Sequence, residues 1–164
     1  MFSVNDYIMY GTVGVCKVID IKREKFLNSV EKEYYVLTPV YSKNTIIKIP
    51  VDNEKIPMRY LLTKEDVDFL INTMPNKEVL WIDDDKMRSE QFKTMLKSGE
   101  CEELITLIRS IYLNKKERKS FGKKSFKTDD EIMQTAEKLL NEEFGVILGI
   151  PPEEVPNYIK NHIA

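Results

Sequence analysis

The hydrophobic residues of this 164-residue chain change their spacing near residue 60. Before that point, aliphatic and aromatic residues recur at alternate positions in short runs, which is the spacing of half-buried β-strands. After that point they recur at intervals of three and four residues, which is the spacing of amphipathic helices. The sequence therefore predicts an α+β protein with two domains, a β-rich domain at residues 1–60 and an all-helical domain at residues 61–164.

Several short strands are expected in residues 1–60. The expected strands are residues 7–10, the alternating run of Val13, Val15, Ile19 and Ile21, residues 33–40 and residues 45–49. Asn28 and Ser29, and then residues 42–44, supply turn chemistry, and Pro50 ends the last run because it has no N–H to donate to a ladder. Four or more short antiparallel strands within about fifty residues predict a small SH3-like or Tudor-like β-barrel.

The remainder of the chain carries start and stop signals for helices. Residues 63–66 (TKED) have the capping-box pattern, and Pro75 ends the helix that follows. Ser98 and Gly99 are typical of a left-handed helix end. Further helices are expected to begin at residues 83–85 (DDD), near residue 100, at residues 128–131 (TDDE) and at residue 153.

Composition and missing motifs exclude several classes of function. The chain is 42% hydrophobic and 32% charged, as in ordinary globular proteins, and its first residues show no secretory pattern, so we expect a cytoplasmic protein. Cys16 and Cys101 form no C-x-x-C motif, and the single histidine, His162, lies almost at the end of the chain. No nucleotide-binding, nucleophile-elbow or zinc-helix motif is present. The sequence predicts no enzyme, metal site or cofactor.

An acidic run and a basic run each leave two interpretations open. Residues 83–85 either cap a helix or form a carboxylate site of a small enzyme. Residues 109–127 hold eight basic residues against Glu117 alone, in a chain of net charge −2, and either contact DNA or form a solvated helix end. The candidate DNA-binding residues in this stretch are Arg109, Lys115, Lys116, Lys123 and Lys124.

Trp81 is the only tryptophan, and it lies shortly before the basic stretch. A lone indole beside a cationic surface suits a residue that pries stacked bases apart. The alternative is a buried anchor that seals the junction between the two domains.

Several segments, in this order and spacing, together resemble one family. They are YGTVGVCKV at residues 10–18, KIPV at 48–51, Trp81 followed by Lys86, Arg88 and SGE at 98–100, AEKLLNEE at 136–143 and LGIP at 148–151. In this pattern the chain resembles the CarD/CdnL family of bacterial transcription regulators, in its clostridial form. The resemblance spans nearly the whole chain.

The resemblance implies two binding functions and a mechanism. It implies a Tudor-like domain that binds the β subunit of RNA polymerase, with contacts from Arg23, Lys25, Lys48, Ile49 and Pro50. It also implies a helical domain that touches promoter DNA, where Trp81 enters the minor groove at the upstream edge of the bubble and stabilises the open complex. Lys86 and Arg88 would be the nearest phosphate contacts. We expect a monomer whose unaided binding to DNA is weak.

One departure from the family and one alternative function remain. Some members place arginines directly after the tryptophan, whereas this chain has residues 82–85 (IDDD) before Lys86, and carboxylates repel phosphates. The alternative function is an adaptor whose SH3-like barrel binds a peptide, with no direct role in contacting DNA.

Overall fold

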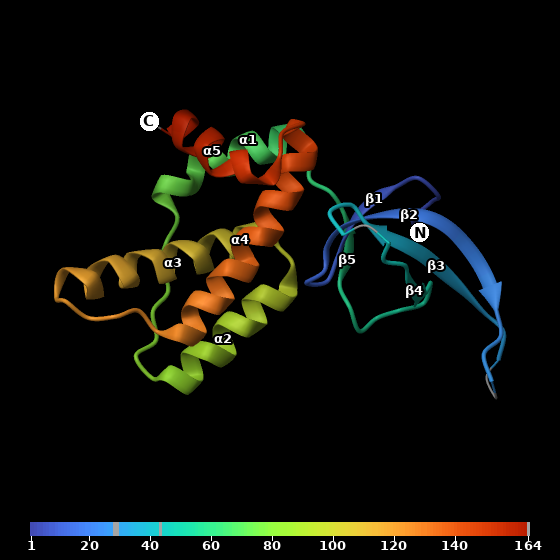
Figure 1. The fold of residues 1–164 in the computed structure, drawn as a ribbon, viewed down its shortest axis with the longest axis horizontal. Helices are drawn as coiled ribbons and strands as arrows, with labels where there is room; N and C mark the ends of the chain where they lie inside the picture. The colour runs from blue at the N-terminus through green and yellow to red at the C-terminus, as the bar shows by residue number, and fades with distance from the viewer. Residues whose placement is uncertain (28–29, 43, 164) are drawn as a thin grey trace. The chain divides into compact units, whose positions relative to one another are not determined.

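The structure is a computed structural model that describes residues 1–27, 30–42 and 44–163 (Figure 1). The chain divides into two compact units, Met1–Leu61 and Leu62–Ala164, whose boundary lies one residue from the position expected from the sequence. The turn expected at Asn28 and Ser29 lies outside the described residues, as does Lys43 of the second expected turn.

The first unit is one five-stranded antiparallel sheet. Its strands are β1 (Tyr7–Tyr10), β2 (Gly14–Glu24), β3 (Lys32–Pro39), β4 (Ile47–Pro50) and β5 (Met58–Tyr60), in the spatial order β4-β3-β2-β1-β5. Consecutive strands pair as hairpins from β1 to β4, and β5 returns to pair with β1. The sheet followed by helices confirms the expected α+β class.

The buried residues of β2 match the expected alternation of valines and isoleucines only in part. Val15 is buried as expected, but Cys16 and Val18 are fully buried as well, and Ile19 is exposed. A register shift between Val18 and Asp20 explains the difference, because one extra residue in a strand moves the following side chains to the opposite face. Beyond this bulge, Ile21 packs against the core.

The second unit is built from helices. They are α1 (Lys64–Thr73), the 3₁₀ turn η1 (Met74–Asn76), α2 (Asp85–Ser98), α3 (Cys101–Ser120), α4 (Lys127–Leu148), the 3₁₀ turn η2 (Pro152–Glu154) and α5 (Val155–Ile163). The expected capping box is present at the start of α1, where Thr63 and Asp66 each accept a hydrogen bond from the other's backbone N–H. Gly99 ends α2 with a φ of 70°, as its sequence signal predicted. Within the described residues, no helix is both long and apolar enough to cross a membrane.

The start of α4 differs from the expectation. Phe126, and not a residue of the TDDE segment, occupies the N-cap position, and its side chain makes no capping hydrogen bond. The helix already includes Lys127 and Thr128. Asp129 is buried and binds an arginine of α2, so this carboxylate serves a tertiary contact in place of a cap.

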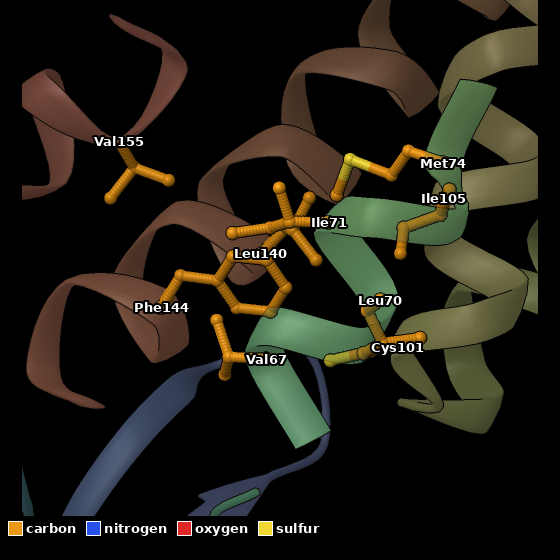
Figure 2. Packing of buried hydrophobic residues seen from close by; sticks show 9 residues of the cluster. All are labelled: Val67, Leu70, Ile71, Met74, Cys101, Ile105, Leu140, Phe144 and Val155. Atoms are coloured by element: carbon orange, nitrogen blue, oxygen red, sulfur yellow. The ribbon is translucent and has the colours of Figure 1, made fainter. Parts of the chain in front are cut away.

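Side chains from four helices converge in one core of this unit (Figure 2). The buried members are Val67, Leu70, Ile71, Met74, Cys101, Ile105, Leu140, Phe144 and Val155. Beside this core lies Glu143, which is fully buried. Its two carboxylate oxygens accept hydrogen bonds from the backbone N–H of Leu62 at 3.0 Å and from the thiol of Cys101 at 3.1 Å. These donors offset part of the cost of removing a carboxylate from water.

Gly145 lies where the end of α4 closely approaches the turn that follows it. A Cβ at this position would lie 2.9 Å from the carbonyl oxygen of Ile150, and a backbone atom cannot move aside cheaply. Helix propensity alone predicts that Gly145→Ala stabilises the protein by about 1 kcal/mol. We expect the opposite sign, a loss of about 1–3 kcal/mol in the free energy of unfolding, because the added methyl group overpacks the site. Urea denaturation followed by circular dichroism measures the change, and a stabilised variant would contradict this close approach.

Candidate nucleic-acid interface

The segment that carries Trp81 has no regular secondary structure and runs from η1 to α2. It is fixed by side chains of the second unit. The backbone N–H of Leu80 donates a hydrogen bond of 2.8 Å to the hydroxyl of Ser110, which is buried on α3. A connector pinned next to its tryptophan holds the indole with less conformational freedom than an open loop allows.

The indole of Trp81 is half-buried and packs against other aromatic rings of its own unit. Its ring centroid lies 6.2 Å from that of Phe92 on α2, with an interplanar angle of 61°. The ring of Phe126, at the start of α4, lies 6.4 Å away and is tilted by 30°. The indole is therefore seated in the second unit and still keeps part of its surface open to solvent.

The seat of the indole consists of Phe92, Phe126 and the guanidinium of Arg88. The Cζ atom of Arg88 lies 4.4 Å from the ring centroid of Trp81 and 4.6 Å from that of Phe126. Arginine is suited to such a position because its planar cation stacks on aromatic rings and is more weakly hydrated than an ammonium group. Arg88 thus links the indole to the helical scaffold.

Hydrogen bonds occupy the same guanidinium. Nε donates to Asp129 at 3.0 Å, Nη1 donates to the carbonyl oxygen of Ile82 at 2.8 Å, and Nη2 donates to Asp85 at 2.8 Å. The side chain of Arg88 is only 2% exposed. This burial argues against the predicted phosphate contact of Arg88, because the guanidinium has almost no exposed surface to offer.

The carboxyl of Asp129 is affected by the same burial. Desolvation raises the pKa of Asp129 above its ordinary value, and the nearby charge of Arg88 acts in the opposite direction. Removing one partner of such a buried pair strongly destabilises the protein, because the other charge is then left in a poorly solvating site.

The acidic run at residues 83–85 has structural partners. The carboxylate of Asp84 accepts a hydrogen bond of 2.9 Å from the backbone N–H of Met87 and so caps α2, while Asp85 binds Arg88. In the described part of the chain, no group of three or more His, Cys, Asp or Glu side chains is arranged to hold a metal ion. These contacts agree with the helix-capping interpretation of the run.

Two residues that the sequence did not single out as site residues, Arg118 and Phe126, lie next to this seat. The Cζ atom of Arg118 lies 4.0 Å from the ring centroid of Phe126, and its Nε donates a hydrogen bond of 2.8 Å to the carbonyl oxygen of Lys124. The contacts therefore form a chain in which Trp81 contacts Arg88, Arg88 contacts Phe126, and Phe126 contacts Arg118. An aromatic residue inside a basic stretch was the available signal, since stacking on rings is typical of nucleic-acid-binding surfaces.

The expected basic residues do not all share this site. Lys86, Lys116, Lys123 and Lys124 are exposed, so their charges face solvent. Lys115 is also exposed, but it forms an ion pair of 3.4 Å with Asp130 on α4.

Arg109 has a different environment from the other expected DNA contacts. It is half-buried on α3, and its Nη2 lies 3.4 Å from the carbonyl oxygen of Pro75. Among the residues that the structure describes, no hydrogen bond, ion pair or ring contact joins Arg109 to the aromatic seat around Trp81.

The expected polymerase contacts lie on two strands of the first unit. Lys48 on the edge strand β4 is exposed, and its Nζ lies 2.8 Å from a carboxylate oxygen of Glu24 at the end of β2. Arg23 and Lys25 are exposed near the same end of β2, and Pro50 is half-buried. Ile49 is a buried member of the core, so its side chain offers little surface to a partner, and the polymerase contact expected at this position stays a prediction. Side chains alternate along a strand, and Ile49 points to the face opposite Lys48.

The buried pair gives a stability test that separates Arg88 from its exposed neighbour. Arg88→Met should lower the free energy of unfolding of the second unit by about 3–5 kcal/mol, because it leaves the Asp129 carboxyl without its cation. Lys86→Met, on the same helix, should change it by less than about 0.5 kcal/mol. Trp81 fluorescence reports unfolding of this unit, because the chain has no other tryptophan. Equal, small effects of the two substitutions would contradict the structural role of Arg88.

One family model matches part of the chain. No curated protein matches the chain. Residues 2–62, which are nearly the whole of the first unit, match the family model described as CarD-like/TRCF RID domain. This match is consistent with the CarD/CdnL resemblance and suggests a transcription-related protein that interacts with RNA polymerase. The first unit is thus similar to the CarD-like/TRCF RID domain, which is a Tudor-like domain.

Proposed function

We propose that this chain is a non-enzymatic transcription regulator that binds the β subunit of RNA polymerase through its first unit and stabilises the promoter open complex through its second. The observation that carries the DNA-binding half of this proposal is the seat of Trp81. A half-buried indole, held against Arg88 and beside Phe126, is a preformed wedge. The family match of residues 2–62 supports the polymerase-binding half.

The energetics favour a wedge that acts on DNA already opening. Separating a base step costs a few kcal/mol, and an apolar ring recovers part of this cost by filling the gap. A ring that is already fixed loses little side-chain entropy on insertion. Trp81 therefore binds melted promoter more favourably than closed duplex, and this difference sets how far the equilibrium shifts.

Two of the cations expected to contact DNA in the second unit are already engaged within the protein. The chain carries a net charge of −2, Arg88 is buried, and Lys115 is paired with Asp130. Non-specific affinity depends mainly on the number of phosphates neutralised, so affinity of the free protein for DNA is low. Docking on polymerase compensates, because a short link raises the effective concentration of the second unit at the promoter to about the millimolar range.

The edge of the sheet offers a surface for polymerase. Strand β4 lies at one end of the strand order, so one side of its backbone has no partner strand in the described sheet. An edge strand of this kind presents N–H and C=O groups to a protein partner, and exposed side chains add specificity. Lys48 is the exposed cation on that strand, and Arg23 and Lys25 extend the positive charge at the end of β2.

Trp81→Ala tests the wedge. We expect the substitution to reduce the preference for the open over the closed complex by about 5- to 150-fold, because stacking of one base on an aromatic side chain contributes about 1–3 kcal/mol. Capture of polymerase should be unchanged. The measurement is the lifetime of open promoter complexes with purified polymerase, alongside a pull-down.

Trp81→Phe is the matched control, since it keeps an aromatic ring against Arg88 and should retain part of the effect. Circular dichroism of both variants checks that the second unit remains folded. Open-complex lifetimes that do not change with Trp81→Ala would refute the wedge. Loss of the effect with a pull-down that contains a different protein and no polymerase would favour the peptide-binding adaptor.

Lys48→Glu tests the polymerase contact. It should weaken capture of polymerase at least about tenfold, because it reverses a charge at an interface that requires a cation. The substitution also places two carboxylates together, since Lys48 pairs with Glu24. The double variant Glu24→Lys with Lys48→Glu restores the local pair, so it separates the two causes.

Persistent loss of capture in the charge-swapped variant supports a direct contact from Lys48. Recovery of capture assigns the loss to local repulsion and places the interface elsewhere. Lys55→Glu, an exposed lysine of the same unit, controls for the change in net charge. Surface plasmon resonance with immobilised polymerase measures all three variants.

A further inference from the structure

A mostly apolar hollow lies in the second unit. Its volume is about 550 Å³, and helices α3, α4 and α5 line it together with Met74 of η1. Its floor includes Met74, Ile105 and Leu140 of the core cluster, which Figure 2 shows close together. Tyr112 and Ile163 line it as well and are exposed, which places apolar groups at its rim. A hollow of this size is within the usual range for small-molecule sites.

Two cations line the hollow without a carboxylate partner. Arg109 and Lys160 form no ion pair within 4.0 Å among the residues that the structure describes. The hydrogen bond from Arg109 to the carbonyl of Pro75 is long, at 3.4 Å, and its Nε is buried without an acceptor. A half-buried guanidinium with so few acceptors is poorly satisfied, and an anionic oxygen would satisfy it.

Glu137 is the one carboxylate in the hollow's described lining. Burial raises the pKa of this carboxyl above its ordinary value, while the charge of Lys115 acts in the opposite direction. One carboxylate faces two cations in this lining. The lining thus combines apolar walls with a net positive charge.

We propose that this hollow binds a small amphiphile with one carboxylate head and an unbranched apolar chain, in the class of medium-chain fatty acids. The carboxylate pairs with Arg109 and Lys160, and the chain lies over Met74, Ile105 and Leu140. Charge complementarity selects the head, and the apolar floor selects the tail. An amphipathic helix would need a row of anchor sites along an extended groove, whereas the lining residues surround a single hollow.

Calorimetry with decanoate and decanol on the full chain tests this site. The wild type should bind decanoate saturably and decanol at least about tenfold more weakly, because the alcohol forms no charge-assisted hydrogen bond. Arg109→Leu keeps much of the apolar stem and should weaken decanoate binding at least about tenfold while leaving decanol unchanged. Lys116→Leu, on the same helix and outside the hollow, should leave both affinities unchanged.

Two further variants distinguish binding from a change in folding. Glu137→Gln removes the one repulsive group and should strengthen decanoate binding several-fold, a gain that damage to the fold would not produce. Ile108→Trp fills the hollow and should abolish binding of both compounds, with thermal unfolding confirming that the variant folds.

Equal affinities for decanoate and decanol in the wild type, or no saturable binding of decanoate, would overturn the proposal. Binding of an amphipathic helical peptide in the absence of decanoate binding would reassign the hollow to protein docking. Neither polymerase nor DNA enters these measurements, so their outcome is independent of the proposed regulatory function.

Discussion

The buried ion pair between Arg88 and Asp129 is the interaction on which the second unit's site depends. It joins α2 to α4 through two side chains that are 2% and 4% exposed. Removing both groups from water is costly, and attraction between them does not by itself guarantee a net gain in stability. Arg88 offsets that cost with further hydrogen bonds to Ile82 and Asp85 and with contacts to the rings of Trp81 and Phe126. The same contacts that satisfy the cation therefore position the indole.

This arrangement changes which charges are available at the surface. The charge of Arg88 is used inside the protein, so the proposed phosphate contacts near Trp81 would come from exposed neighbours such as Lys86 and from the loop after α3. Besides Arg88, Arg118 is a cation that contacts the aromatic seat, because it packs on Phe126. Its hydrogen bond to Lys124 also orders that loop. The proposed interface is thus a surface around stacked rings, and the spacing of basic residues along the chain describes it poorly.

Local signals in the sequence predicted local structure accurately. The capping box at Thr63 and the left-handed end at Gly99 depend on a few adjacent residues, and both are present as expected. Predictions failed where a distant partner decided the outcome. The TDDE segment at residues 128–131 was expected to cap α4, but its Asp129 binds Arg88, 41 positions away in the sequence. Ile19 of β2 was expected to be buried but is exposed, because a bulge against β3 changes the register, and no feature of β2 alone announces a bulge.

The candidate site shows the same difference between what local sequence predicts and what distant partners decide. In the sequence alone, a basic residue that faces solvent, as Lys86 does, cannot be distinguished from one that lies in the core, as Arg88 does. Only a buried acid and aromatic neighbours distinguish the two, and these come from α4 and from the segment before α2. On the proposed function, this use of Arg88 strengthens the dependence on polymerase. Each cation committed to holding the wedge is unavailable to neutralise phosphate, so the free protein loses affinity for DNA while the indole gains a fixed position. A regulator built in this way acts chiefly where its first unit has already placed it.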